Sequence, residues 1–156
     1  MSKVISIKRV KAKSGTVAAL MTRPAVTVRP DLSLESLQDL FVERGLSRVP
    51  VVDGRGRAVG VIAKTDLIND RADALDTSEE EGPVRGSHVH AEPRTVEELM
   101  TKNVVTVRAD APLWIAAELM ADRALHGVPV VDTRQVVVGM LSSLDFVRFV
   151  ARGKGS

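Results

Sequence analysis

An internal repeat constrains this chain more than any other feature. Shifted by 79 positions, residues 17–68 align with residues 96–147 without a gap, and 22 of the 52 aligned pairs are identical. The identical blocks are LMT at 20 and 99, VTVR at 26 and 105, and VPVVD at 49 and 128. A duplication of this extent predicts two similar structural units in one chain.

Each copy has the pattern of a small α/β unit. Thr95 and Glu98 have the spacing of a capping box and predict a short leading helix, and Thr16 is placed to cap its counterpart. AVTV (25–28) and VVTV (104–107) are short β-branched runs and predict strands.

An amphipathic helix and a hairpin follow in each copy. The apolar face of the helix comprises Leu34, Leu37, Leu40 and Phe41 in the first copy, and Leu113, Ala116, Ala117, Leu119 and Met120 in the second. VPVVD and the later VG strand enclose a turn, where we expect Asp53 and Asp132 to have turn roles. A closing helix is predicted to begin at Asp66 and at Asp145.

The predicted architecture is α/β (α+β): two β-α-β-β-α repeats packed about a pseudo-two-fold axis, with a cleft on either side of it. A unit of this size is marginal alone, because a 60-residue domain buries only about 60% of its unfolded surface. The predicted organisation is a basic arm (1–15), the first repeat (16–75), a linker (76–94), the second repeat (95–150) and a tail (151–156).

Composition argues against several kinds of site. The chain has no cysteine, which excludes disulfides and thiolate metal sites and fits a reducing cytoplasm. No apolar run is long enough to span a membrane, and no nucleophile elbow or P-loop is present, so we expect no enzyme activity. His88, His90 and Glu92 have a chelating spacing, but no fourth ligand is evident, and we interpret them as a solvated loop.

The order and spacing of these motifs resemble the CBS domain, and two in tandem resemble a CBS pair, or Bateman module. The resemblance implies binding of an adenine nucleotide in the clefts, with AMP, ADP or ATP ahead of S-adenosylmethionine or NAD. It implies the ligand motif G-h-h-[ST]-x-x-D, whose Asp accepts hydrogen bonds from ribose. GMLSSLD provides Gly139, Ser142 and Asp145, whereas GVIAKTD keeps Asp66 but has Ala63 at the hydroxyl position.

The pair of residues before each VPV strand is the second implied contact, because relatives often have His-Arg there. Here the positions hold Ser47 and Arg48 in the first copy, and His126 and Gly127 in the second. By the resemblance, Arg48 would bind phosphate in the cleft of Asp145, and His126 would serve the cleft of Asp66 as a weaker partner. The alternatives are helix caps for the two aspartates and a solvated charge for Arg48.

We therefore expect a stand-alone, cytoplasmic regulatory protein that signals to an unknown effector by changing conformation. Trp114 on the apolar second helix favours a homodimer. One alternative is a structural or interaction dimer that binds no ligand. Another is a nucleic-acid binder that uses the five basic residues among 1–15.

Overall fold

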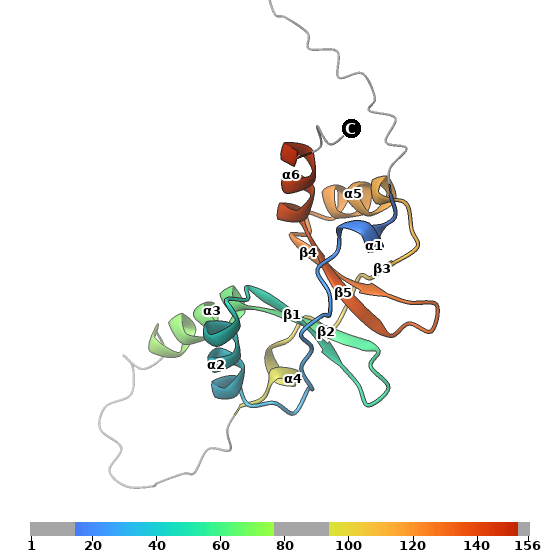
Figure 1. The fold of residues 1–156 in the computed structure, drawn as a ribbon. Coiled ribbons are helices and arrows are strands. Elements are labelled where there is room, and N and C mark those ends of the chain that lie inside the picture. Colours follow the sequence, from blue (N-terminus) through green and yellow to red (C-terminus); the bar gives the residue numbers. More distant parts are fainter. Residues whose placement is uncertain (1–14, 77–93, 153–156) are drawn as a thin grey trace, which may run out of the picture.

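The computed structural model describes residues 15–76 and 94–152. Predictions for the basic arm, the inter-repeat linker and the HVHAE segment lie outside the described residues. The first copy contains α1 (Val17–Leu20), α2 (Leu34–Arg44), β1 (Arg48–Val52), β2 (Ala58–Ala63) and α3 (Lys64–Asp76). The second contains α4 (Val96–Leu99), β3 (Val107–Arg108), α5 (Leu113–Asp122), β4 (Gly127–Val131), β5 (Val137–Ser142) and α6 (Ser143–Arg152) (Figure 1).

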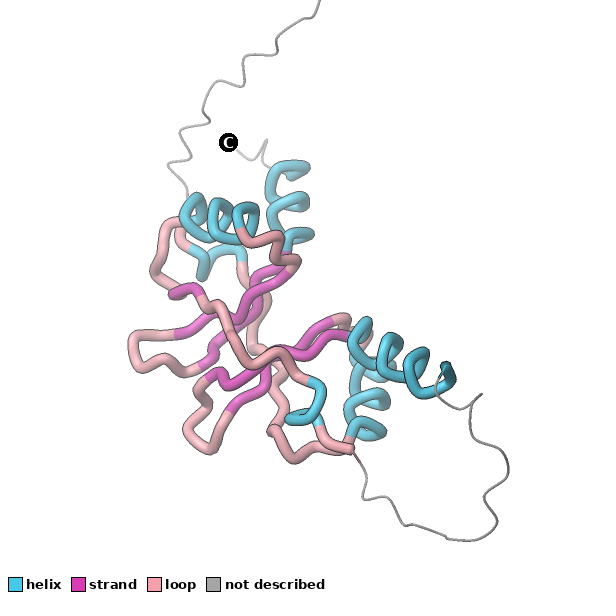
Figure 2. The backbone as a smooth tube through the Cα atoms, turned by 180° about the vertical axis from the view of Figure 1, so that it is seen from behind, coloured by secondary structure: helices cyan, strands magenta, loops and turns pink. Residues whose placement is uncertain are grey.

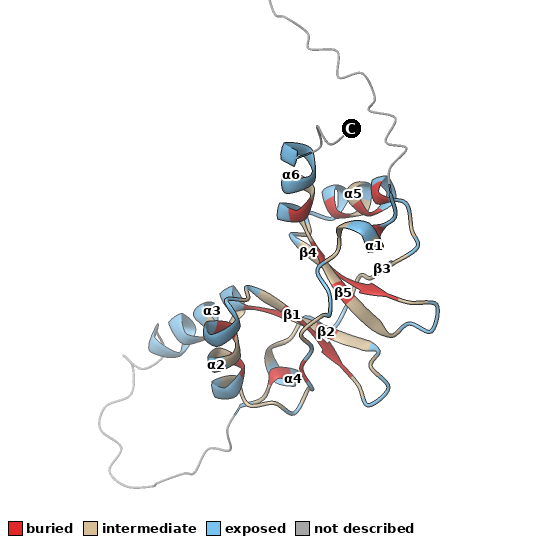
Figure 3. Cartoon of the chain, viewed as in Figure 1, coloured by how far each residue is buried: buried red, intermediate tan, exposed pale blue. Residues whose placement is uncertain are grey.

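The tandem α/β architecture is confirmed. β1 pairs antiparallel with β2, and β4 pairs antiparallel with β5, in the same relative register. The strands of the two copies converge at the centre of the molecule, and the longer helices lie towards the outside (Figure 2). Burial follows this arrangement, since the buried residues lie on the strands and on the helix faces turned towards them (Figure 3).

The expected AVTV and VVTV strands are shorter than predicted. The second is reduced to β3, which pairs parallel with β4. The first is a single bridge, in which the N–H of Val28 donates to the carbonyl of Pro50 (3.1 Å) and its own carbonyl accepts from Val52 (2.8 Å). Only six residues earlier, Thr22 pairs with Met140 of the other copy. Between Thr22 and Val28 the chain passes from the sheet that contains β5 to the sheet that contains β1. Too few residues remain there to form a full strand.

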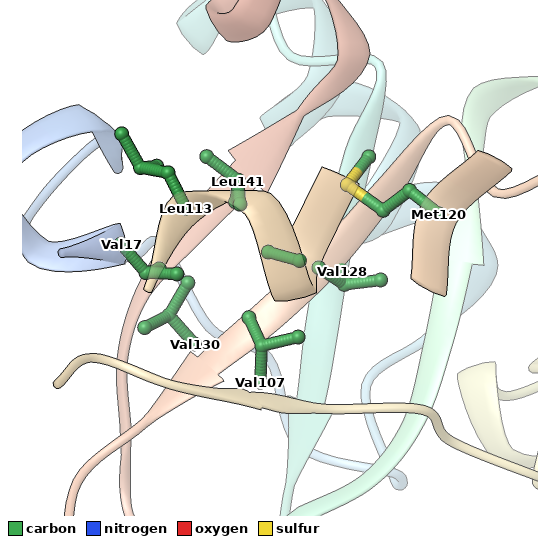
Figure 4. Close-up of a cluster of buried hydrophobic side chains, with 8 residues drawn as sticks. Val17, Val107, Leu113, Met120, Val128, Val130 and Leu141 are labelled. Atoms are coloured by element: carbon green, nitrogen blue, oxygen red, sulfur yellow. The ribbon is translucent and has the colours of Figure 1, made fainter. Parts of the chain in front are cut away.

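The short leading helices are exchanged between the copies. Val17 of α1 is fully buried in a core formed otherwise by the second copy, with Val107, Leu113, Val130 and Leu141 (Figure 4). Val96 of α4 is fully buried in the core of the first copy. We predicted that each copy would be one unit with its own leading helix; instead, each leading helix completes the other unit.

Glycines in β2 and β5 permit this exchange. A Cβ at Gly139 would lie 2.7 Å from Sδ of Met21 and 2.9 Å from the backbone oxygen of Thr22. The same segment of the second copy packs on Gly60, where a Cβ would lie 2.9 Å from Cγ of Met100. These positions accept no side chain because a backbone segment of the other copy lies directly against them.

The amphipathic helices are confirmed. Leu37 and Phe41 of α2 are buried, as are Leu113, Ala116 and Met120 of α5. In α2, the Ser33 hydroxyl accepts from the N–H of Ser36 (3.1 Å), and Gly45 ends the helix in the left-handed conformation that favours glycine.

The capping-box prediction for the leading helices is wrong. Neither Thr16 nor Thr95 caps its helix through the side chain. Glu98 instead forms an ion pair with Arg94 (3.2 Å), which also contacts Asp70 of α3. The guanidinium competes for the carboxylate that the cap would need, and the two partners raise the pKa of Arg94.

The turn roles of the hairpin aspartates are confirmed. One carboxylate oxygen of Asp53 accepts from the N–H groups of Arg55 (2.8 Å) and Arg57 (3.1 Å). Asp132 accepts from Arg134 and Val136 in the same way. These backbone donors stabilise the ionised carboxylate and lower the pKa of Asp53.

Candidate functional site

A cleft with a cavity volume of 280 Å³ lies between the two copies. It brings together four of the residues singled out in the sequence, Ser47 and Arg48 from the first copy and Ser142 and Asp145 from the second. We call it the Asp145 cleft. The other residues that line it are Thr22, Pro24, Ala25, Val26, Gly45, Leu46, Val49, Gly127, Met140 and Arg148.

Asp145 is held in place by a reciprocal cap at the start of α6. Its Oδ2 accepts from the N–H of Ser142 (2.8 Å), and its own N–H donates to the Ser142 hydroxyl (3.2 Å). This is a capping box with aspartate at the third helical position, so Asp145 lies in the first turn and does not begin the helix. The residue is only 9% exposed. No described residue donates to its Oδ1, so that oxygen is free to accept from a ligand.

The first copy has half of this cap. Oδ2 of Asp66 accepts from the N–H of Ala63 (2.7 Å), but alanine returns no hydroxyl. Asp66 likewise lies in the first turn of α3, which begins at Lys64. Both aspartates thus take part in helix capping from the first turn and are not themselves the N-cap residues, and one oxygen of each carboxylate is left out of the cap.

Arg48 begins β1 and reaches across to the second copy. Its side chain lies over Gly127, where a Cβ would be 3.1 Å from Nη1. The residue is half-buried, and its guanidinium has no ion pair or hydrogen bond within the described part of the chain. Ser47 is exposed, and its carbonyl accepts from the N–H of Lys64 (2.8 Å) at the end of the same hairpin.

Arg148 was missed at the sequence level. It lies on α6 three residues after Asp145, so the two side chains share one helical face, and it lines the same cleft. The equivalent position in the first copy is Asn69. This difference between the copies, together with the i, i+3 spacing from Asp145, was a signal that could have identified it.

A second, smaller cleft with a volume of 180 Å³ lies at the pseudo-equivalent position. His126 lines it, as do Arg48 and Gly127, and we call it the His126 cleft. Asp66 is not among its lining residues, because the cavity does not extend to the first turn of α3. The structure thus joins the residues predicted for the Asp145 cleft but does not bring Asp66 and His126 into one cavity. The remaining lining residues are Val61, Thr101, Asn103, Val104, Val105, Ala124, Leu125 and Val128.

Within residues 15–76 and 94–152, no group of three or more His, Cys, Asp or Glu residues is arranged to hold a metal ion. No helix in these ranges is long and apolar enough to cross a membrane.

The model of the CBS domain matches this chain twice, at residues 17–73 and 96–152. Among solved structures, the chain is similar to CBSX2 of Arabidopsis thaliana in complex with AMP, with a TM-score of 0.71 and 28% identity over 90% of this chain and 99% of that one. It is similar to the CBS domain pair of protein MJ0100 in complex with 5′-methylthioadenosine and S-adenosyl-L-methionine, with a TM-score of 0.70 and 28% identity over 88% and 97% of the two chains.

The cytosolic domain of the Mg²⁺ channel MgtE in complex with ATP has a TM-score of 0.66 and 29% identity over 86% of this chain and 48% of that one. Among curated proteins, L-aspartate semialdehyde sulfurtransferase of Methanocaldococcus jannaschii is 29% identical over 90% of this chain. The match covers 24% of that protein, so the chain spans about a quarter of this curated relative.

Proposed function

Because the chain belongs to the CBS domain family, we propose that it is a regulatory module that binds an adenine nucleotide in the Asp145 cleft. The observation that carries this proposal is the meeting of Arg48, Ser142 and Asp145, from both copies, around one cavity. The similar structures hold AMP, ATP or S-adenosyl-L-methionine with 5′-methylthioadenosine, which makes an adenosyl ligand the favoured class.

The chemistry of the cleft suits the two polar parts of a nucleotide. A carboxylate with a free oxygen, as in Asp145, accepts hydrogen bonds from ribose hydroxyls. Arg48 and Arg148 supply two guanidinium groups, which pair with phosphate through forked, charge-assisted hydrogen bonds. This pair of cations favours a phosphorylated ligand such as AMP, ADP or ATP over S-adenosylmethionine, which has no phosphate.

In this proposal the ligand signals by changing how the two repeats, residues 16–75 and 95–150, are oriented. Ligand binding shifts such an equilibrium only through unequal affinity for the two orientations, typically about 1–3 kcal/mol. The module acts by binding and not by catalysis, in the cytoplasm, and an effector reads its orientation.

A homodimer is part of the same proposal, because the outer faces of α5 and α6 expose apolar side chains. Trp114 of α5 is 60% exposed, and Leu144, Val147 and Phe149 are exposed on α6. Soluble proteins usually cover apolar surface of this kind with a partner. Sedimentation of the native protein and of Trp114→Glu tests the expectation: the native chain should be dimeric and the variant should shift towards monomer.

Thermal shift with AMP, ADP, ATP, S-adenosylmethionine and NAD tests ligand binding directly. At 100 times Kd, a ligand adds about 2.7 kcal/mol to the stability of the folded state. Asp145→Ala is expected to weaken AMP binding in the Asp145 cleft and so to reduce the AMP-dependent shift. Asp66→Ala is the matched control, since it removes the equivalent helix-cap acceptor and should leave the AMP shift intact. If no ligand shifts the native protein at millimolar concentration, the sensor proposal is wrong and a purely structural dimer is favoured.

A further inference from the structure

The two clefts share one wall, which is formed by Arg48 and Gly127. These residues occupy equivalent positions in the two copies, and both line both clefts. A Cβ at Gly127 would lie 3.1 Å from Nη1 and 3.4 Å from Cδ of Arg48. A residue that contacts its own equivalent must lie at the pseudo-two-fold axis. The guanidinium of Arg48 therefore lies at this axis, between the two cavities.

The chain places one arginine at the axis and not two. A Cβ at residue 127 would require the Arg48 side chain to move slightly, and a second guanidinium there would add like-charge repulsion. Within the described ranges Arg48 has no carboxylate partner. A half-buried cation without a partner keeps its donors available for an anion that enters either cleft.

Apart from this shared wall, the two clefts differ in their charged lining residues. The Asp145 cleft has a second cation, Arg148, whereas no lysine, other arginine or carboxylate lines the His126 cleft among the described residues. His126 itself is exposed. A phosphate in the His126 cleft would therefore depend on Arg48 far more than a phosphate in the Asp145 cleft does.

We propose that Arg48 is a phosphate ligand shared by both clefts and that it couples them negatively, so that a nucleotide phosphate bound in one cleft weakens phosphate binding in the other. A guanidinium turned towards one phosphate presents its fork to that phosphate and not to the other. Two phosphates bound on opposite edges of the same group would repel each other at short range. Either effect disfavours the binding of a second phosphate. A nucleoside, which has no phosphate, binds in the His126 cleft without this loss of affinity.

This inference rests on the proposed function and adds a testable coupling to it. Isothermal titration of the native chain with AMP is expected to show one site in the Asp145 cleft and a second event at least about tenfold weaker, the scale of one charge-assisted hydrogen bond. Asp145→Ala weakens AMP binding in the Asp145 cleft and so leaves Arg48 available to the His126 cleft. Its remaining site, in the His126 cleft, should therefore bind AMP about tenfold or more tightly than the second event of the native chain.

Two controls distinguish the sharing of Arg48 from a difference in intrinsic AMP affinity between the two clefts. Adenosine has no phosphate, so Asp145→Ala should not improve its binding in the His126 cleft. The double variant Arg48→Ala/Asp145→Ala should lose the gain for AMP. If Asp145→Ala is poorly folded by circular dichroism, Asp145→Asn serves instead, since its amide oxygen can still accept from the N–H of Ser142, and it should show a smaller gain.

Three results would overturn the sharing of Arg48. The first is two equal and independent AMP sites in the native chain, which would leave nucleotide binding itself intact. The second is an Asp145→Ala variant whose remaining AMP site is no tighter than the second event of the native chain. The third is a native chain that binds no AMP at all, which would overturn the proposed function as well.

Discussion

The exchanged leading helices make Val17→Ala a diagnostic substitution. Val17 belongs to the first copy in sequence but is fully buried in the core of the second. The change removes two buried carbons, worth about 1.6 kcal/mol at about 0.8 kcal/mol each. Incomplete collapse of the cavity adds about 0.5–1 kcal/mol. The expected loss in the free energy of unfolding is thus about 2–2.5 kcal/mol, which lowers Tm by roughly 4–10 °C.

Native-state hydrogen exchange shows where this loss falls. Local stability is distributed over cooperative units, so Val17→Ala should lower amide protection mainly in α5, β4 and β5, far along the chain. Val96→Ala is the matched control, because Val96 is fully buried in the core of the first copy, and it should lower protection mainly in α2, β1 and β2. If Val17→Ala instead weakens the first hairpin most, the exchange of the leading helices is wrong.

Three further substitutions test local features. Gly139→Ala places a Cβ 2.9 Å from the carbonyl oxygen of Thr22. The free energy of unfolding in urea should fall by about 1–3 kcal/mol, and an unchanged midpoint would contradict the close approach. Ser142→Ala reproduces the half cap of the first copy and should lower the free energy of unfolding by about 0.5–2 kcal/mol. It should also weaken AMP binding in titration, and full affinity would show that the hydroxyl has no part in the site. The backbone donors to Asp53 lower its pKa in the folded state. Its ionised carboxylate therefore stabilises the fold at pH values above its unfolded-state pKa, near 3.8. This stabilisation is lost as the pH falls through the folded-state pKa. The Tm difference between the native chain and Asp53→Asn should therefore be present at pH 6 and shrink below about pH 4; a constant difference would refute the assignment.

Much of the fold follows from local sequence. The apolar faces of α2 and α5 depend on helical spacing, and both hairpins depend on β-branched runs around an Asp-initiated turn. The cluster of Arg48, Ser142 and Asp145 was predicted from the resemblance to the CBS domain, and it lies around one cavity. Whether these residues bind a nucleotide stays a prediction.

Other features depend on contacts between distant segments. The Thr95 cap failed because Arg94 takes the carboxylate of Glu98 while also contacting Asp70, a residue 24 positions away. The strand expected at 25–28 is one bridge, because the chain there crosses from one sheet to the other. Arg148 was missed because its local signals, the i, i+3 spacing from Asp145 and the difference from Asn69, indicate a site residue only once the cleft beside α6 is known.

The duplicated sequence by itself determined two similar units, their helices and hairpins, and the residues that differ between the clefts. Tertiary structure alone decided which core each leading helix enters, because Val17, Leu20 and Met21 repeat identically as Val96, Leu99 and Met100. Identical apolar patterns fit either core equally well, so only the path of the chain in space selects between them. The same holds for Arg48, whose place between two clefts follows from the pseudo-two-fold axis that brings it onto Gly127.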